Sequence, residues 1–359
     1  MQMVKRIDNN TRVSIELKVQ DWKNERLNFI EDILKNGHSQ KLWEKAYAYF
    51  YQRVESRFLK PIQWILDKGK DKGEGFSAVA LQCILIEFLE SFYQGKIYTP
   101  SSDPNHFEYN KSERLFIDFL MNHHPFSNYF QKKKSARGFY SNIRCGLLHE
   151  AATKETSRIK SGFHSNDIID FIENYDTNMF VYKDNFFKAI IDYLRSYKEE
   201  LFKNKSLKIN FVRKFDDICG IKRVMYFAYG SNLFKEQLFY RIKKYHTAQT
   251  AILKDFKFSY NKKGKDGTAK ANIVKSENSK VYGVIYEIDE DDFKKLNNVY
   301  EKGYDQLNIT VNCNGALNAI TFKSDSIINN IGPSEEYRLV IRKGAKEWNL
   351  DGGYIENNL

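Results

Sequence analysis

At Tyr226-Phe227-Ala228-Tyr229-Gly230-Ser231-Asn232-Leu233, this 359-residue sequence changes from a strand pattern to a turn pattern. Aliphatic and aromatic residues from Arg223 to Tyr229 predict a buried strand, and the glycine with two small polar residues that follows predicts a tight turn. The amphipathic run 234–245 predicts a helix after the turn. Backbone N–H groups at the start of such a helix would bind a carboxylate or phosphate, so residues 229–233 are a candidate ligand cradle. The alternative interpretation of the same pattern is an ordinary turn with a capping residue.

Two different hydrophobic patterns divide the chain. Residues 1–205 have apolar positions at helical spacing, which predicts an all-α helical bundle packed around the apolar segment 76–93. Short segments of residues 223–359 alternate with the period of a strand and are separated by turn signals. This pattern predicts a small α+β domain with a mostly antiparallel, barrel-like sheet. Residues 206–222 are expected to be the linker.

The expected elements follow from these patterns. Helices are predicted in the N-terminal part at 12–35, 40–67, 76–93, 112–122, 135–153, 166–175 and 178–203. Strands are predicted in the C-terminal part at 223–229, 249–260, 270–275, 280–288, 304–311 and 316–323, with helices at 234–245, 290–299 and 335–348.

Composition narrows the class of protein. The net charge is +11, which is compatible with a polyanionic partner such as RNA and equally with a lysine-rich solvated surface. The four cysteines contain no CxxC pair, so neither a zinc site nor a disulfide framework is indicated. The longest apolar run, 76–93, is interrupted by Gln82, Glu87 and Glu90, which is typical of a core helix and not of a membrane span. We expect a soluble, cytoplasmic protein with no membrane segment.

The helical part contains one candidate catalytic pair, Arg144 and His149, with an Arg-x4-His spacing. Five positions along an α-helix rotate the side chain by roughly 140°, so one copy does not place both groups on one face. In a two-fold dimer, both pairs would converge in one cleft, where histidine acts as acid or base and arginine offsets phosphate charge. The alternative is structural: Arg144 in an ion pair with Glu150 or Glu155, and His149 as an interior or capping group.

This segment in its helical setting resembles the HEPN superfamily over roughly residues 40–205. The resemblance implies a metal-independent ribonuclease of the toxin or antiphage effector type. Its substrate would be RNA, with tRNA as one candidate target, and the helical domain would form a homodimer. Neither a metal nor a cofactor is implied. The neighbouring His123 and His124 precede Pro125 and are expected in a surface loop, with RNA contact as the lesser option.

The C-terminal part resembles the γ-glutamylcyclotransferase-like family across residues 223–359. The octapeptide at 226–233 is similar to the family's Y-F-x-Y-G-S-N-L. Further similar segments follow in the family's order: Ala271-Asn272-Ile273, Val281 to Tyr286, Glu301 with Gly303-Tyr304, Pro333 to Tyr337, and Gly344-Ala345-Lys346-Glu347. The resemblance implies a mixed barrel in which the Tyr229–Leu233 loop binds a γ-glutamyl group and Glu301 moves a proton. The products would be 5-oxoproline and a free amine, with no cofactor required.

The chain departs from the family around its glutamate. Where the family has Leu-Asp-x-x-Glu-Gly, this chain has Leu296-Asn297-Asn298-Val299-Tyr300-Glu301-Lys302, which is one residue longer. Glu301 still aligns, helped by Tyr304, and Tyr337 is a candidate pocket residue. The alternative is that Glu301 is a surface carboxylate paired with Lys302 and that the domain binds without turnover.

These resemblances describe a fusion of two domains. The first hypothesis gives the C-terminal domain activity on a γ-glutamyl small molecule or a γ-glutamyl-modified group, and the second makes the helical domain an RNA-cleaving effector. Two alternatives remain: a cyclotransferase whose helical half is only a dimerisation scaffold, and a non-enzymatic protein with two binding modules.

Overall fold

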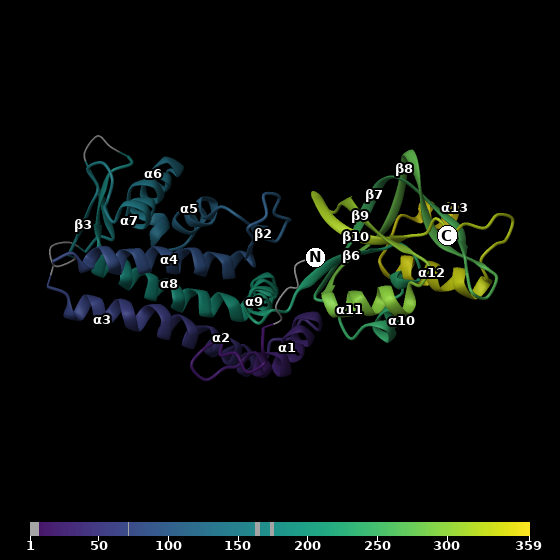
Figure 1. Ribbon diagram of the computed structural model, residues 1–359, viewed down its shortest axis with the longest axis horizontal. Helices are drawn as coiled ribbons and strands as arrows, with labels where there is room; N and C mark the ends of the chain where they lie inside the picture. The colour runs from purple at the N-terminus through teal and green to yellow at the C-terminus, as the bar shows by residue number, and fades with distance from the viewer. Residues whose placement is uncertain (1–6, 71, 162–165, 173–175) are drawn as a thin grey trace. The chain divides into compact units, whose positions relative to one another are not determined.

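The computed structural model describes residues 7–70, 72–161, 166–172 and 176–359, which divide into two compact units, Met1–Gly220 and Ile221–Leu359 (Figure 1). The segment 206–222 is not the expected linker, because helix α9 (Lys205–Ile218) occupies most of it. The Asn204 side chain caps this helix by accepting hydrogen bonds from the backbone N–H groups of Ser206 and Leu207. Phe211 and Phe215, one turn apart, are fully buried in the first unit, so the helix is part of its core.

The N-terminal unit is mainly helical. Its helices are α1 (Val19–Leu34), α2 (Gln40–Val54), α3 (Lys60–Lys68), α4 (Glu74–Gln94), α5 (Ser112–Asn122), α6 (Lys133–Phe139), α7 (Gly146–Glu150), α8 (Lys183–Lys203) and α9, with π-helical turns η1 (Glu55–Leu59) and η3 (Tyr140–Cys145) and the 3₁₀ turn η2 (Phe126–Asn128). Helices α3, α4 and α8 run side by side along this unit (Figure 1). Aromatic rings of α2, α4 and α9 meet in the core, where the ring centroids of Phe50 and Phe92 are 4.8 Å apart and those of Phe92 and Phe211 are 5.4 Å apart.

Helix α4 is long and apolar enough to cross a membrane by length and composition alone. However, 61% of its most apolar window is buried inside the unit. Gln82 and Glu90 are themselves buried on this helix, and the Gln82 side-chain amide donates a hydrogen bond to the backbone carbonyl of Lys183. The packing of α4 is therefore that of a core helix.

The expectation of an all-α N-terminal part is wrong in detail. The unit contains short strands: β1 (Ile97–Tyr98) and β2 (Glu108–Tyr109) pair with each other, and β3 (Arg158–Lys160), β5 (Met179–Tyr182) and β4 (Ile169–Phe171) form a three-stranded sheet. The helix expected at 166–175 is replaced by β4, because Ile169 pairs across the sheet with Val181 and both are buried. Residues 173–175 of that expectation lie outside the described residues.

The C-terminal unit confirms the expected small mixed barrel. Its strands are β6 (Arg223–Ala228), β7 (Thr247–Lys263), β8 (Ala269–Asp289), β9 (Asp305–Asn312) and β10 (Ala316–Lys323), and they close in the order β10-β6-β8-β7-β9. The β10–β6 pair is parallel and the other pairs are antiparallel. The two strands expected at 270–275 and 280–288 are one continuous strand, β8.

Helical segments connect and cover this barrel (Figure 1). They are the 3₁₀ turn η5 (Ser231–Leu233), α10 (Lys235–Arg241), α11 (Glu290–Lys295), the π-helical turn η6 (Leu296–Tyr300), α12 (Glu335–Glu347) and α13 (Gly352–Asn358). Helix α12 packs directly on η5. A Cβ atom added to Gly344 of α12 would lie 2.3 Å from the backbone nitrogen of Phe234, so only glycine lets the helix approach the turn this closely.

Candidate functional site

A pocket opens beside the end of strand β6. Its empty volume is about 290 Å³, part of which is open to solvent. It is lined by Tyr226, Tyr229, Gly230, Ser231, Asn232, Ala271, Glu301, Tyr304, Phe322 and Tyr337. Residues from distant parts of the chain, including the octapeptide and the glutamate segment, therefore meet at one place.

The turn after β6 forms one wall of this pocket. The backbone N–H of Leu233 donates to the carbonyl of Gly230 at 2.9 Å and that of Phe234 to the carbonyl of Ser231 at 3.2 Å, which closes the 3₁₀ turn. Successive side chains in a 3₁₀ turn are about 120° apart. As a result Ser231 and Asn232 line the pocket, while Leu233 is fully buried and absent from the lining. That the backbone N–H groups of the Tyr229–Leu233 loop bind a ligand stays a prediction.

Glu301 is held inside the site and not at the surface. Its side chain is only 14% exposed, and its Oε1 accepts hydrogen bonds from Asn232 Nδ2 at 3.0 Å and Arg241 Nη1 at 3.2 Å. The alternative of a surface carboxylate paired with Lys302 is therefore wrong. Among the described residues, the ion pair of Glu301 is with Arg241.

The extra residue before Glu301 is accommodated in the π-helical turn η6. The backbone N–H of Glu301 donates to the carbonyl of Leu296, five residues earlier, at 2.9 Å. A π-helical turn takes up one residue more than an α-helical turn and so keeps the following residues in register. The longer sequence therefore still brings Glu301 to the pocket.

Burial raises the pKa of the Glu301 carboxyl above its ordinary value, because desolvation disfavours the charged form. The positive charges of Arg241 and Lys262 and the hydrogen bond from Asn232 oppose that shift. A carboxyl group with a raised pKa takes up and releases a proton closer to neutral pH than an exposed glutamate does.

Tyr304 and Tyr337 hold the opposite wall through one residue of β8. The Tyr304 hydroxyl donates to the carbonyl of Ala271 at 2.6 Å, and the Tyr337 hydroxyl accepts from the N–H of Ala271 at 3.3 Å. Burial raises the pKa of both phenols, so they stay neutral and keep their hydroxyl protons. A Cβ atom on Gly230 would lie 3.1 Å from that of Ala271 and 3.7 Å from the Tyr337 hydroxyl, so glycine keeps this part of the pocket open.

Sequence reasoning missed two cations at this site. Arg241, the last residue of α10, also donates from Nη1 to Asn232 Oδ1 at 2.7 Å. Lys262 of β7 is 8% exposed, and its Nζ donates to the carbonyl of Lys302 at 3.1 Å. The only sequence signal for Arg241 is a basic residue on the predicted helix that follows the turn, because its direction depends on where that helix ends.

Comparison with known proteins places the chain in a family. The AIG2-like family matches residues 280–357, within the C-terminal unit. A γ-glutamylcyclotransferase from Bos taurus is 32% identical over 133 residues, which are 34% of this chain and 70% of the bovine protein. The chain belongs to the γ-glutamylcyclotransferase family.

Solved structures of γ-glutamylcyclotransferases are also similar to part of the chain. One such structure is 25% identical, covers 38% of this chain and 85% of its own, and has a TM-score of 0.34. A yeast γ-glutamylcyclotransferase described as specific to glutathione is 12% identical, covers 36% of this chain and 90% of its own, and has a TM-score of 0.29. The HEPN-like identity of the helical unit stays a prediction.

In the helical unit of this cyclotransferase-family chain, the two predicted catalytic residues differ in exposure and in their partners. Arg144 lies in η3, is 17% exposed, and pairs through Nη2 with Glu87 Oε2 at 3.3 Å. His149 is exposed near the end of α7. The expected alternative partner Glu150 instead pairs with Lys154. Arg144 is therefore ion-paired as the structural alternative proposed, although with a different carboxylate, while His149 is not an interior group.

His123 is not the surface residue that was expected, although His124 is exposed. Its ring is 7% exposed, and Nε2 lies 2.7 Å from Glu90 Oε2. The rings of Tyr93 and Tyr193 pack against it in edge-on geometry. The carboxylate of Glu90 on the core helix supplies the polar partner that permits this burial.

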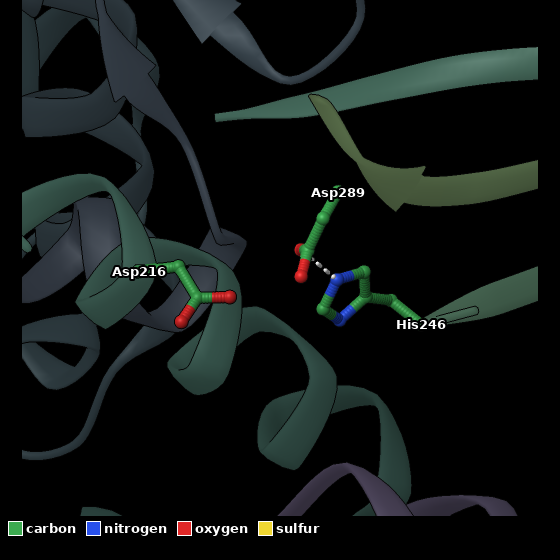
Figure 2. Close-up of side chains that lie close together, drawn as sticks. All are labelled: Asp216, His246 and Asp289. Atoms are coloured by element: carbon green, nitrogen blue, oxygen red, sulfur yellow. Dashed lines mark hydrogen bonds and ion pairs between the residues drawn. The ribbon is translucent and has the colours of Figure 1, made fainter. Parts of the chain in front are cut away.

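Figure 2 shows a second histidine–carboxylate contact, which belongs to the cyclotransferase-family unit: His246 Nε2 lies 2.7 Å from Asp289 Oδ1. This pair joins the start of β7 to the end of β8 and is not part of the pocket lining. Asp216, also drawn in Figure 2, belongs to the helical unit, where it accepts hydrogen bonds from Trp22 Nε1 at 2.7 Å and Arg26 Nε at 2.8 Å. We assign both arrangements to the stability of their own units.

Proposed function

We propose that the C-terminal unit is an active γ-glutamylcyclotransferase that converts a γ-glutamyl amide to 5-oxoproline and a free amine. The observation that carries this proposal is a single carboxylate, Glu301, 14% exposed at the wall of a pocket. Membership of the family and the bovine relative's name support the same reaction class.

The reaction needs a proton carrier because two protons move from one nitrogen to another. The substrate's α-amine, once deprotonated, attacks its own γ-carbonyl carbon, and a new C–N bond closes the ring. The original C–N bond then breaks. Glu301 accepts the proton that the attacking nitrogen releases and delivers it to the leaving nitrogen, while solvent carries the other proton from the initial ammonium to the final one. The raised pKa of the Glu301 carboxyl suits both directions of this transfer.

The remaining pocket residues orient the substrate in this proposal. The small residues of the 229–232 turn let the glutamyl group lie close to the backbone, and Gly230 leaves open the space that a side chain would fill. Tyr304 and Tyr337 form the opposite wall as neutral donors or acceptors. Orientation contributes strongly to rate when nucleophile and electrophile belong to one molecule. The substrate is a γ-glutamyl small molecule or a γ-glutamyl-modified group, and no cofactor takes part.

The test is release of 5-oxoproline by the purified full-length chain. The substrates would be a γ-glutamyl amino acid, a γ-glutamyl peptide, a γ-glutamyl polyamine and a γ-glutamyl-ε-lysine. We expect turnover of at least one of them by the wild type and none above background by Glu301→Gln. Equal product release by both proteins would overturn the role of Glu301, and no release by the wild type from any of the four would overturn the proposed activity.

A second candidate function concerns the helical unit. We propose RNA cleavage by Arg144 and His149 in a homodimer, as a toxin or antiphage effector, because His149 is exposed near the end of α7. An exposed imidazole is accessible to a ribose hydroxyl or leaving oxygen. The basic composition is compatible with RNA binding, which salt would then weaken.

A further inference from the structure

We propose that Arg241 is a positioning residue for the cyclotransferase reaction: together with Asn232 it fixes Oε1 of Glu301 and leaves Oε2 as the oxygen that carries the proton. This inference rests on the proposed function of Glu301 and assigns a role to an arginine outside the pocket lining.

The arrangement is a closed triangle of side chains. One nitrogen of Arg241, Nη1, donates to Asn232 Oδ1 at 2.7 Å and to Glu301 Oε1 at 3.2 Å. The third side is the hydrogen bond from Asn232 Nδ2 to Glu301 Oε1 at 3.0 Å. Each member contacts both others, so none can rotate without breaking two hydrogen bonds.

The triangle is anchored to the barrel. Asn232 Nδ2 also donates to the Tyr226 hydroxyl at 2.7 Å, and Tyr226 is 4% exposed on strand β6. The guanidinium of Arg241 lies over the Tyr300 ring, with Cζ 5.3 Å from the ring centroid. Tyr300 directly precedes Glu301, so Arg241 contacts both the carboxylate and the segment that carries it.

The two oxygens of Glu301 are therefore not equivalent. Oε1 accepts both hydrogen bonds of the triangle, and among the described residues no hydrogen bond reaches Oε2. Because Glu301 lines the pocket, Oε2 is the oxygen that is left for a substrate nitrogen. A proton bound at Oε1 would displace one of two existing donors, whereas a proton at Oε2 displaces none.

Other polar groups face Glu301 from neighbouring elements. They are Lys262 on β7, whose charge favours the carboxylate, and the hydroxyls of Tyr226, Tyr229, Tyr304 and Tyr337, whose pKa values are all raised. The tyrosines stay neutral over the working range, so the cations that oppose the effect of burial on Glu301 are Arg241 and Lys262. Arg241 makes the direct hydrogen bond.

The experiment compares the full-length wild type with Arg241→Met and Arg241→Lys, using Lys243→Met, an exposed cation two residues away, as the matched control. For Arg241→Met we expect kcat to fall about 100-fold with KM within a few-fold of wild type, because misplacing a reacting group costs on this order. The acidic limb of its pH–rate profile should move to higher pH. Arg241→Lys should restore the position of that limb and part of kcat, and Lys243→Met should match the wild type.

Two further measurements separate failure of this inference from failure of the proposed function. The first is ¹³C NMR of the full-length protein with ¹³C in its glutamate carboxyl groups, in which the Glu301 signal is identified by its loss in Glu301→Gln. This signal reports the protonation of Glu301 without any substrate. We expect the titration to move to higher pH in Arg241→Met, and an unchanged titration with unchanged kcat would overturn the inference. In crystals with 5-oxoproline, we expect Oε2 to contact the ring nitrogen; contact through Oε1, with Arg241 displaced, would also overturn it. Absence of turnover in the wild type overturns the proposed function, whereas the titration still tests whether Arg241 holds the Glu301 carboxylate.

Discussion

The pocket of the C-terminal unit and the Arg144–His149 segment of the helical unit differ in how many parts of the chain meet there. Around Glu301, side chains arrive from β6, the 229–232 turn, α10 and α12. Arg144 and His149 both come from the consecutive segments η3 and α7, and the partner of Arg144 is Glu87 of the core helix α4. Reactive groups are held in a defined geometry when several anchored elements enclose them. The barrel encloses Glu301 in this way, whereas a single helical segment carries Arg144 and His149.

The two regions also differ in the burial of their candidate acid–base groups. The Glu301 carboxyl is buried next to one arginine, and its pKa is raised because desolvation outweighs that arginine. His149 is exposed to solvent near the end of α7. Perturbed titration in a cleft is a mark of functional sites, so the raised pKa of Glu301 favours the barrel as the catalytic unit.

The largest expected effect separates the two regions outright. Glu301→Gln should lower 5-oxoproline release by about 10²- to 10⁴-fold, because it removes the proton carrier and keeps the shape of the side chain. The double variant Arg144→Ala/His149→Ala should retain wild-type release. A double variant as defective as Glu301→Gln would show that the helical residues contribute to the same reaction.

A substitution behind the pocket tests whether the close packing of α12 on the turn matters. Gly344→Ala should destabilise the C-terminal unit by about 1–3 kcal/mol, since its Cβ would lie 2.3 Å from the backbone nitrogen of Phe234. Denaturant unfolding, followed by a signal that comes from the C-terminal unit alone, measures the loss of stability. The exposed Lys346→Ala on the same helix is the control, and equal stability of the two variants would contradict the packing argument.

The pH dependence gives a smaller but directional effect. Glu301 must be deprotonated to accept a proton, and its pKa is raised, so kcat/KM should fall as pH drops through a value above that of an ordinary glutamate. Above that value the rate should be level until another group titrates. A pH–rate profile whose acidic limb lies at or below the ordinary glutamate range would contradict burial as the dominant cause.

The smallest effect on stability is expected in the helical unit. Arg144→Ala breaks the partly exposed contact with Glu87 and should cost no more than about 1 kcal/mol, so the variant should fold. Its expression in a bacterial host, beside wild type and His149→Ala, then tests RNA cleavage by growth and total-RNA integrity. Fragmentation by the wild type alone would support the ribonuclease candidate, and intact RNA in all cultures, phage challenge included, would leave the helical unit as a scaffold.

Most elements could be predicted because their hydrophobic patterns are strong. Strand β10 (Ala316–Lys323) and helix α5 (Ser112–Asn122) have the expected bounds, and α4 differs from its expected bounds by a residue or two at each end. Local patterns were insufficient at 166–175, where pairing with β5 turned an expected helix into strand β4, and at 206–222, where charged residues between the phenylalanines hid the core helix α9. In both cases contacts distant in sequence decided the outcome.

Some features of the site could likewise be predicted from local sequence, and others could not. The sequence by itself determined the turn at 229–233, the glutamate at 301 and the tyrosines at 304 and 337, because their residue types and order are legible along the chain. Only the tertiary structure decided that Leu233 faces the core, that a π-helical turn compensates the extra residue, and that Arg241 reaches Glu301 from 60 positions away. The physical reason is that side-chain direction and ion pairing depend on where each element ends and on what packs behind it, and neither is a property of a local segment.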